Sequence, residues 1–358
     1  MCSGMVIKGR GAVSNEASQR FGLAEREADG DWQDVQAALD GELPPLRTHV
    51  AVETPRTILT RNRSPDVPFD RSVNPYRGCE HGCIYCFARP THAYHDLSPG
   101  LDFETRLFAK PDAPTLLRRE LAARAYVVKP IAFGTNTDAY QPIEERWRIM
   151  RGCLEVLAET RHPCSITTKS DRVLRDLDLL APMAAKGLVA VILSVPTIDP
   201  ATARTLEPRA TAPTKRLAAV RALSAAGISV HVSIAPVIPH VTDHEMEGIL
   251  AAAAEAGARG AFFLPVRLPH EVAPLFRAWL DAHLPDRAAK VMHTIQSIRG
   301  GRDNDPDFFT RMKGQGPWAE LLRTRFALAC RRLGLNRERL VLRTDLFRAP
   351  EGAQGSLF

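Results

Sequence analysis

The sequence predicts an α/β protein built on a parallel sheet. From Ser72 to Arg267, short apolar runs alternate six times with longer segments of helical periodicity, and this alternation is typical of parallel βα units. The run 188–195 is almost continuously apolar, as expected of a strand buried on both faces. The 196 residues from Ser72 to Arg267 give about 33 per unit, close to the ~31 of a barrel with eight units in roughly 250 residues. This pattern fits both an incomplete barrel and a doubly wound sheet.

The six expected strands are short and apolar, and each is followed by a polar residue, a glycine or a proline. By residue number they are 72–76, 129–135, 164–170, 188–195, 228–236 and 260–266. In βα barrels the reactive groups come from the carboxyl ends of the strands and the loops after them. We therefore expect the residues at these ends to gather on one face of the molecule.

Helices are expected between the strands, at 113–126, 143–160, 171–187, 211–227 and 242–257. Asp112 and Pro114 mark the start of the first helix. Gly187 and Gly227 end two others, because glycine readily takes the left-handed conformation that stops a helix. After the last strand the chain is again mostly helical, at 268–284, 286–298 and 316–334. The Gly- and Asp-rich loop 300–316 is of a length that usually has a function or no fixed structure.

Three regions follow from this pattern. Residues 1–60 are polar and are expected to form a partly ordered extension, with one short amphipathic helix around Trp32. Residues 61–268 form the α/β core, entered through the proline-rich segment 54–70, whose prolines favour extended backbone. Residues 269–358 form a mostly helical C-terminal region.

The composition is that of an ordinary soluble protein, with 45% hydrophobic and 25% charged residues. No stretch approaches the roughly 20 apolar residues that span a bilayer, and the N-terminus lacks the apolar run of a signal peptide. Seven cysteines without a regular framework fit free thiols and a metal site in a reducing compartment. We expect a cytoplasmic protein with no membrane partner. The net charge of +6 permits a polyanionic partner.

Three cysteines stand close together in the segment NPYRGCEHGCIYCF. Cys79, Cys83 and Cys86 have the spacing C-x3-C-x2-C. A [4Fe–4S] cluster bound only by protein needs four thiolates, so three would leave one iron open to an outside molecule. Gly78 and Gly82 allow the backbone to wrap around a bulky cluster. Tyr85, just before the last cysteine, offers an aromatic face beside the open iron.

Other interpretations of these cysteines remain open from the spacing alone. The three thiolates with His81, His92 or His95 would make a structural Cys3His zinc site. Such a site would suit a zinc-stabilised nucleic-acid-binding protein. A non-catalytic iron–sulfur electron carrier is a second alternative. A thioredoxin-like role for Cys83 and Cys86 is less favoured, because a third cysteine stands four residues upstream.

The cysteine motif, with its aromatic residue before the last cysteine, resembles the cluster loop of the radical S-adenosylmethionine (radical SAM) superfamily. The wider stretch NPYRGCEHGCIYCFARPTHAY is similar to the subgroup of spore photoproduct lyases and photolyase-like proteins. The resemblance implies a partial (β/α)6 barrel, a [4Fe–4S] cluster on Cys79, Cys83 and Cys86, and SAM bound at the open iron. It also implies a radical SAM enzyme that cleaves SAM to methionine and a 5′-deoxyadenosyl radical. An electron donor such as flavodoxin or ferredoxin would reduce the cluster.

The resemblance also assigns residues to SAM. The segment GTNTD, which comprises Gly134, Thr135, Asn136, Thr137 and Asp138, matches the superfamily motif that faces the SAM ammonium. Lys169, followed by Ser170, matches the position that contacts the SAM carboxylate. Ser194 stands where a ribose contact is expected. Val237 and Ile238 are candidates for the adenine or for the core, and Arg209 is a candidate for the site or the solvated surface.

The substrate does not follow from the resemblance, although a nucleic acid is one candidate. Spore photoproduct lyases carry a cysteine at the end of the second strand that returns a hydrogen atom to the product radical. The matching position here is Gly134, with no cysteine nearby. This departure makes thymine-dimer repair doubtful. The remaining cysteines, Cys2, Cys153, Cys164 and Cys330, are expected to be inert.

Overall fold

The computed structural model describes residues 6–21 and 46–350 of the 358-residue chain. The amphipathic helix expected around Trp32 lies outside these residues. The described chain is organised around a main sheet of seven strands and a small sheet of three strands. No helix in these two ranges is long and apolar enough to cross a membrane.

The main sheet confirms the predicted α/β class and its six parallel strands. Its spatial order is β10-β9-β8-β7-β6-β3-β2. The six parallel strands are β3 (Arg71–Val73), β6 (Ile131–Phe133), β7 (Cys164–Thr168), β8 (Val189–Ser194), β9 (Ser229–Val237) and β10 (Gly260–Pro265). The short edge strand β2 (Leu59–Arg61) is antiparallel to β3. The six parallel strands stand side by side in chain order, without the reversal of a doubly wound sheet. Because the sheet is also open, with β2 and β10 at its two edges, the architecture is that of an incomplete barrel.

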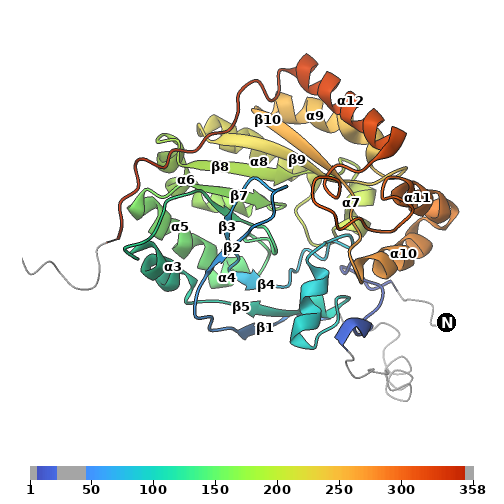
Figure 1. Ribbon diagram of the computed structural model, residues 1–358, viewed down its shortest axis with the longest axis horizontal. Coiled ribbons are helices and arrows are strands. Elements are labelled where there is room, and N and C mark those ends of the chain that lie inside the picture. The colour runs from blue at the N-terminus through green and yellow to red at the C-terminus, as the bar shows by residue number, and fades with distance from the viewer. Residues whose placement is uncertain (1–5, 22–45, 351–358) are drawn as a thin grey trace, which may run out of the picture.

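Parallel pairing places the carboxyl ends of the strands at one edge. Thr168 at the end of β7 pairs with Leu193 of β8, and Ser194 at the end of β8 pairs with Ser233 of β9. Figure 1 shows the arrowheads of β7, β8 and β9 pointing the same way. The loops that follow these strands are therefore the ones that can meet in one site.

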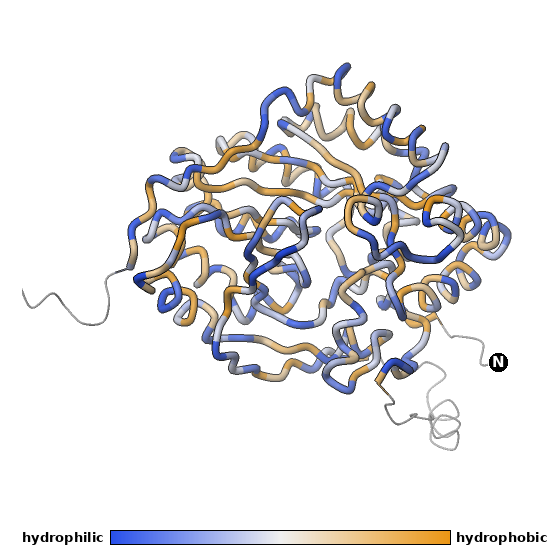
Figure 2. The backbone as a smooth tube through the Cα atoms, viewed as in Figure 1, coloured by the Kyte–Doolittle hydropathy of each residue, from blue (hydrophilic) through white to orange (hydrophobic). Residues whose placement is uncertain are grey.

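Helices from the βα connections cover the outer face of the sheet. They are α3 (Ala113–Leu121), α5 (Ile149–Thr160), α6 (Leu177–Ala184), α8 (Pro213–Ala225) and α9 (Met246–Glu255). Their apolar sides pack with the strands into one large core cluster, and Figure 2 shows the strands largely in the hydrophobic colour. Gly187 and Gly227, with φ of 69° and 80°, end their helices as predicted. The helix α7 (Pro200–Leu206) was not expected.

The helix predicted over 143–160 is interrupted, which corrects that prediction. It forms α4 (Glu144–Trp147) and α5, separated by Arg148 in the left-handed conformation with φ of 51°. The carboxylate of Glu144 accepts hydrogen bonds from the amides of Met150 (3.1 Å) and Arg151 (3.4 Å) at the start of α5. A side chain thus satisfies amide groups that a continuous helix would satisfy with its own carbonyls. The next predicted helix also starts differently, as a 3-10 segment (Asp171–Asp176) before α6.

A second sheet, not expected from the sequence, carries the cysteine motif. Its order is β1-β5-β4, with β1 at His49–Val52, β5 at Arg106–Ala109 and β4 at Tyr76–Arg77. Strand β4 ends two residues before Cys79. The 3-10 segment Arg89–His95 and the short helix α2 (Asp102–Thr105) connect the motif to β5.

The C-terminal region contains the predicted helices, α10 (Val272–His283), α11 (Pro285–Ser297) and α12 (Gly316–Leu333). Helix α12 packs against α9 and β10. Helices α10 and α11 form a second apolar cluster together with Ile84 and Tyr85 of the cysteine motif. The motif is therefore held between the small sheet and the C-terminal helices.

Candidate cluster and SAM site

The cysteine loop is closely packed against its neighbours. Cys79 and Cys83 are buried, and Cys86 is half-buried. Gly78 has a φ of 71°, and a Cβ atom there would lie 2.5 Å from the Leu107 side chain and 2.9 Å from the carbonyl oxygen of Phe103. Only glycine fits this position, because both the backbone angle and the close approach exclude a side chain.

Arg89 anchors the cysteine loop from behind. Its guanidinium donates hydrogen bonds to the carbonyl oxygens of Gly82 (3.1 Å) and Cys83 (2.9 Å). The other donors reach the carbonyls of Pro99 and Gly100 and the carboxylate of Glu104. All five N–H groups of a guanidinium are thus engaged. The side chains of Arg89 and Glu104 are fully buried, so this ion pair fixes the loop backbone on which Cys83 lies.

The N-terminal segment around residues 10–12 covers the carboxylate of Glu104. The amides of Gly11 and Ala12 donate to Glu104 at 3.0 and 2.8 Å. The guanidinium of Arg10 donates to the Glu104 carbonyl at 2.9 Å. A Cβ atom at Gly11 would lie 1.8 Å from the carbonyl oxygen of Gly82, so this segment lies directly on the cysteine loop.

Three hydrogen-bonding side chains join the segment of the cysteine motif to the loop after β6. Thr137 Oγ1 and Gln141 Nε2 both donate to the carbonyl of Gly78, at 2.7 and 3.2 Å, and Gln141 Oε1 accepts from the amide of Glu80 at 2.9 Å. Asn74 Oδ1 accepts from the amide of Asn136 at 3.0 Å. Sequence reasoning gave neither Gln141 nor Asn74 a role, although Asn74 opens the cysteine motif and Gln141 lies three residues after the GTNTD segment.

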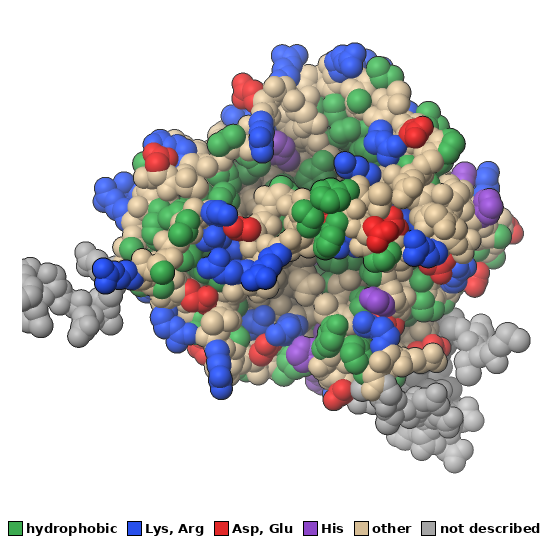
Figure 3. Space-filling model, in the orientation of Figure 1, with side chains coloured by type: hydrophobic (Ala, Val, Ile, Leu, Met, Phe, Trp, Pro, Cys, Tyr) green, Lys and Arg blue, Asp and Glu red, His purple; other side chains and the backbone are tan. Residues whose placement is uncertain are grey.

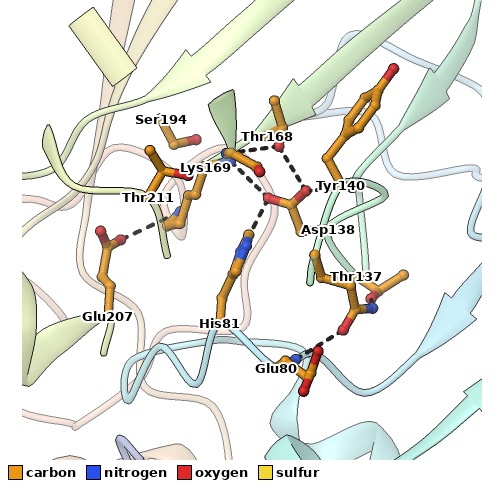
Figure 4. A network of polar contacts seen from close by, with 12 residues as sticks. Glu80, His81, Thr137, Asp138, Tyr140, Thr168, Lys169, Ser194, Glu207 and Thr211 are labelled. Atoms are coloured by element: carbon orange, nitrogen blue, oxygen red, sulfur yellow. Dashed lines mark hydrogen bonds and ion pairs between the residues drawn. The ribbon is translucent and has the colours of Figure 1, made fainter. Parts of the chain in front are cut away.

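Asp138 is the centre of the network drawn in Figure 4. Its carboxylate, on a side chain that is 9% exposed, accepts from Thr168 Oγ1 (2.7 Å), the amide of Lys169 (2.7 Å) and the amide of Tyr140 (2.9 Å). His81 Nδ1 lies 3.4 Å away without hydrogen-bond geometry. Burial would raise the pKa of Asp138, but His81 and the donors of Lys169 and Thr168 lower it to about 2. The ionised carboxylate therefore holds the ends of β6 and β7 together.

Lys169 points toward a second buried carboxylate, Glu207. Lys169 Nζ lies 3.8 Å from Glu207 Oε1 and 5.8 Å from the centroid of the Tyr85 ring. Glu207 also accepts from the Tyr85 hydroxyl and from the guanidinium of Arg216. Burial lowers the pKa of Lys169, but Glu207 and Cys83 outweigh it and the net shift is upward. A charged ammonium is therefore present between Glu207 and the cysteine loop.

Glu207 and Arg216 are functional candidates that sequence reasoning missed. Glu207 belongs to the segment LEPRA after α7, in which only Arg209 was singled out. Arg216 is 1% exposed and also donates to the carbonyl of Ser194 at 2.8 Å. Burial would raise the pKa of Glu207, but Arg216 and Lys169 lower it overall. The ion pair thus joins the end of β8 to the Lys169 site.

The remaining predicted residues lie near the same edge, with differing contacts. Ser170 Oγ accepts from the amide of Arg172 at 3.2 Å and caps the following 3-10 segment. Arg209 Nη2 pairs with Glu80 Oε1 at 3.0 Å, beside the cysteine loop. Val237 and Ile238 are fully buried members of the apolar core.

Gly134 has no room for a side chain. Its φ is 79°, and a Cβ atom would lie 1.9 Å from the carbonyl oxygen of Thr167 on β7. A cysteine at this position would require the backbones of β6 and β7 to move apart. Cys153, Cys164 and Cys330 are buried in the main core cluster, and Cys2 lies outside the described residues.

The donor set consists of three free thiols in one loop, the ligand type that iron–sulfur clusters take. Burial raises the pKa of the Cys79 thiol, and the charges of Asp138 and Cys83 raise it further. Burial likewise raises the pKa of Cys86, while Arg89 and Lys169 oppose that rise. Thiolates close to one another therefore need positive partners, and a cluster of ferric and ferrous ions supplies them. Within residues 6–21 and 46–350, no three His, Cys, Asp or Glu side chains are arranged around a single metal ion.

The fold and the site define a class of protein: an open parallel α/β barrel with three cysteines at the carboxyl ends of its strands. The sequence profile of the Radical SAM superfamily matches residues 73–253. The chain belongs to this superfamily.

The chain is also similar in sequence to several uncharacterised proteins, and similar in fold to a solved structure. Uncharacterised proteins of Mycobacterium bovis and Mycobacterium tuberculosis are 39% identical over 226 residues, which cover 63% of this chain and 66% of theirs. This chain thus spans just under two thirds of those relatives. A protein of Methanocaldococcus jannaschii is 29% identical over 173 residues, covering 48% of this chain and 62% of its own. A structure of spore photoproduct lyase complexed with dinucleoside spore photoproduct is 16% identical, with a TM-score of 0.56 over 80% of each chain. That last similarity is one of fold.

Proposed function

We propose that this protein is a radical SAM enzyme that binds a [4Fe–4S] cluster through Cys79, Cys83 and Cys86. The observation that carries the proposal is the arrangement of three thiols in one anchored loop, in a chain of the Radical SAM superfamily. When bound and reduced, the cluster would supply the electron that cleaves SAM to methionine and a 5′-deoxyadenosyl radical. A small electron carrier such as flavodoxin or ferredoxin would provide that electron.

The residues around the loop have distinct tasks in this proposal. Lys169 would bind the SAM carboxylate, for which a single half-buried ammonium is a suitable partner. The segment Gly134–Asp138 would line the position of the SAM ammonium, and Ser194 that of the ribose. Asp138 would act as a positioning residue, because its carboxylate already binds the amide of Lys169. Tyr85 would present its ring beside Lys169.

Replacing Lys169 should weaken SAM binding without removing the cluster. We expect Lys169→Ala to lose roughly 1.5–3 kcal/mol of binding free energy, the usual contribution of a hydrogen bond to a charged group. The measurement is equilibrium SAM binding to anaerobically reconstituted protein, with iron content determined on the same samples. Lys186→Ala is the matched control, since Lys186 is exposed at the opposite ends of the strands. Equal SAM affinity for Lys169→Ala and wild type would contradict this placement of SAM.

SAM cleavage and lesion repair should separate in this protein. With dithionite, the wild-type protein should form 5′-deoxyadenosine and methionine from SAM without any substrate. With DNA containing spore photoproduct, it should not turn over to intact thymines, because the lyase's hydrogen-donor position is Gly134, where a Cβ atom would meet the backbone of β7. Mass spectrometry of both products checks the two statements. Multiple-turnover repair, with Tyr94 or Tyr140 as donor, would make this protein a lyase after all.

A further inference from the structure

A group of arginines at the open edge of the barrel has no role in the proposed cofactor site. Arg267 follows β10, and Arg299 and Arg311 lie in the segment between α11 and α12. Arg299 is 1% exposed. Its guanidinium donates only to backbone carbonyls, those of Pro265, Val266 and Arg311 at 3.2, 2.8 and 2.6 Å. We refer to Arg267, Arg299 and Arg311 as the edge arginines.

The carboxylates near the edge arginines do not balance their charge. Arg311 uses Asp66 for a bidentate ion pair at 2.6 and 2.7 Å. Asp305, buried and bonded to the amide of Asp307, is the other carboxylate whose charge acts on Arg267 and Arg299. Three guanidinium groups thus face two carboxylates. Burial and the charge of Arg267 lower the pKa of Arg299 to about 10.

Unsatisfied polar atoms occur at the same place. Within the described parts of the chain, the Nε atoms of Arg267 and Arg299 and the Oδ1 atom of Asn304 are buried without a hydrogen-bond partner. The hydrogen bond found for the Arg267 side chain goes to Met312 Sδ, a weak acceptor, at 3.3 Å. Buried guanidinium donors are nearly always satisfied in native proteins. Excess positive charge and free donors together indicate a binding site for an anion.

Two exposed aromatic rings flank the edge arginines. Phe308 and Phe309 are 48% and 61% exposed. Phe309 has a φ of 73°, which is rare for a bulky residue and indicates a constrained, functional position. Arg311 lies over the Phe308 ring at 4.6 Å. In Figure 1 this loop is the brown-red segment between α11 and α12. Figure 3 shows hydrophobic and basic side chains together in the middle of the same face, beside a hollow.

The edge arginines lie on the side of the sheet that carries the cofactor site. Pro265 at the end of β10 pairs with Val237 at the end of β9, so Arg267 follows the carboxyl end of the sixth parallel strand. Lys169 follows the last residue of β7, and Ser194 is the last residue of β8, at the same edge of the sheet. A molecule held by Arg267 would therefore lie along the open mouth of the barrel.

We propose that Arg267, Phe308 and Phe309 bind single-stranded nucleic acid, with the buried Arg299 and the paired Arg311 adding positive charge behind them. Arg267 would hold a phosphodiester through its free donors, since a planar guanidinium matches phosphate geometry. The two phenylalanines would stack on bases, the usual partner of exposed aromatic residues beside a basic groove. An acidic peptide would use the charge but not the two rings. The inference rests on the proposed function, because the bound strand would be the substrate of the radical enzyme.

The test measures binding separately from chemistry. Labelled single-stranded DNA and RNA of one sequence are titrated with reconstituted protein, and fluorescence anisotropy gives the affinity at several salt concentrations. We expect Arg267→Gln to weaken binding at least about tenfold, the ordinary effect of losing a charged hydrogen bond, and to lower the salt slope by about 0.7–1. Phe309→Asn should weaken binding at least about fivefold through lost stacking, while asparagine tolerates the backbone angle.

Two control variants and one competitor make the outcome decisive. Arg221→Gln removes an exposed charge on α8, and Leu328→Asn removes an exposed apolar side chain on α12; both should bind like wild type. Equal affinity for all variants, no binding by wild type, or equal competition by polyglutamate or a free mononucleotide would overturn the inference. If Arg267→Gln does not fold, as judged by circular dichroism, Phe309→Asn decides alone. SAM cleavage by wild type, measured in parallel, tests the proposed function independently.

Discussion

Alanine at Cys79, Cys83 or Cys86 should abolish the cluster in each case. Three thiolates are the whole protein donor set in the proposal, and the other described cysteines are buried in the main core cluster, so no replacement thiolate is at hand. Anaerobically reconstituted wild type should be brown, with nearly equal iron and sulfide. Each variant should be colourless, with both close to zero.

Cys153→Ala provides the control for this experiment. Cys153 is a fully buried residue of α5 in the main core cluster, so its variant should retain iron and sulfide at the wild-type ratio. Retention of a full cluster by Cys83→Ala would contradict the assignment. Stoichiometric zinc in wild type purified without oxygen would also contradict it, and would support a structural zinc site instead.

Glu207→Gln should be the most destabilising single change near the cofactor site. It removes the charge that offsets both Arg216 and Lys169, and leaves two cations facing each other in a buried position. Removing one partner of a buried ion pair costs about 3–5 kcal/mol. We expect the free energy of unfolding of the cluster-free protein to fall by this amount and its urea midpoint to fall with it. Circular dichroism during urea titration measures both.

Two further variants test whether the stability loss of Glu207→Gln comes from the unbalanced charge or from replacing a glutamate in general. Glu255 has a side chain 80% exposed and pairs with Arg221 at 3.7 Å, so Glu255→Gln should unfold like wild type. Glu207→Gln combined with Arg216→Met should recover part of the loss, because the uncompensated charge is gone. A Glu207→Gln midpoint equal to that of wild type would show that the buried pair does not hold this region together.

The main sheet could be predicted because each of its inner strands is an apolar run bounded by polar residues, glycine or proline. Strand β8, buried on both faces, is the clearest case. The small sheet could not be predicted in this way. Its strand β4 has two residues, and β1 alternates too little to give a period. Its stability comes from contacts between segments far apart in the sequence, which local patterns do not report.

The residues of the candidate site also divide into those that the sequence could predict and those that it could not. The cysteines, GTNTD and Lys169 follow strand ends and could be found by position. Glu207 and Arg89 could not, because each is identified by what it meets in three dimensions: Glu207 by Lys169 and Arg216, and Arg89 by the carbonyls of the cysteine loop. In the sequence both read as ordinary charged residues. That these two charged residues are buried is recognisable only once the fold is known.

The N-terminal cover of the cysteine loop has a consequence for the order of events during folding. Gly11 and Ala12 reach Glu104 across 93 and 92 residues, and Arg20 reaches Glu271 at the start of α10 across 251 residues. Contacts between such distant positions form late, because closing long chain loops costs entropy before the contacts can repay it. The cysteines should thus stay accessible while the rest of the barrel assembles. If the proposed cluster is present, iron and sulfide would be delivered in that interval, before residues 10–12 close over the loop.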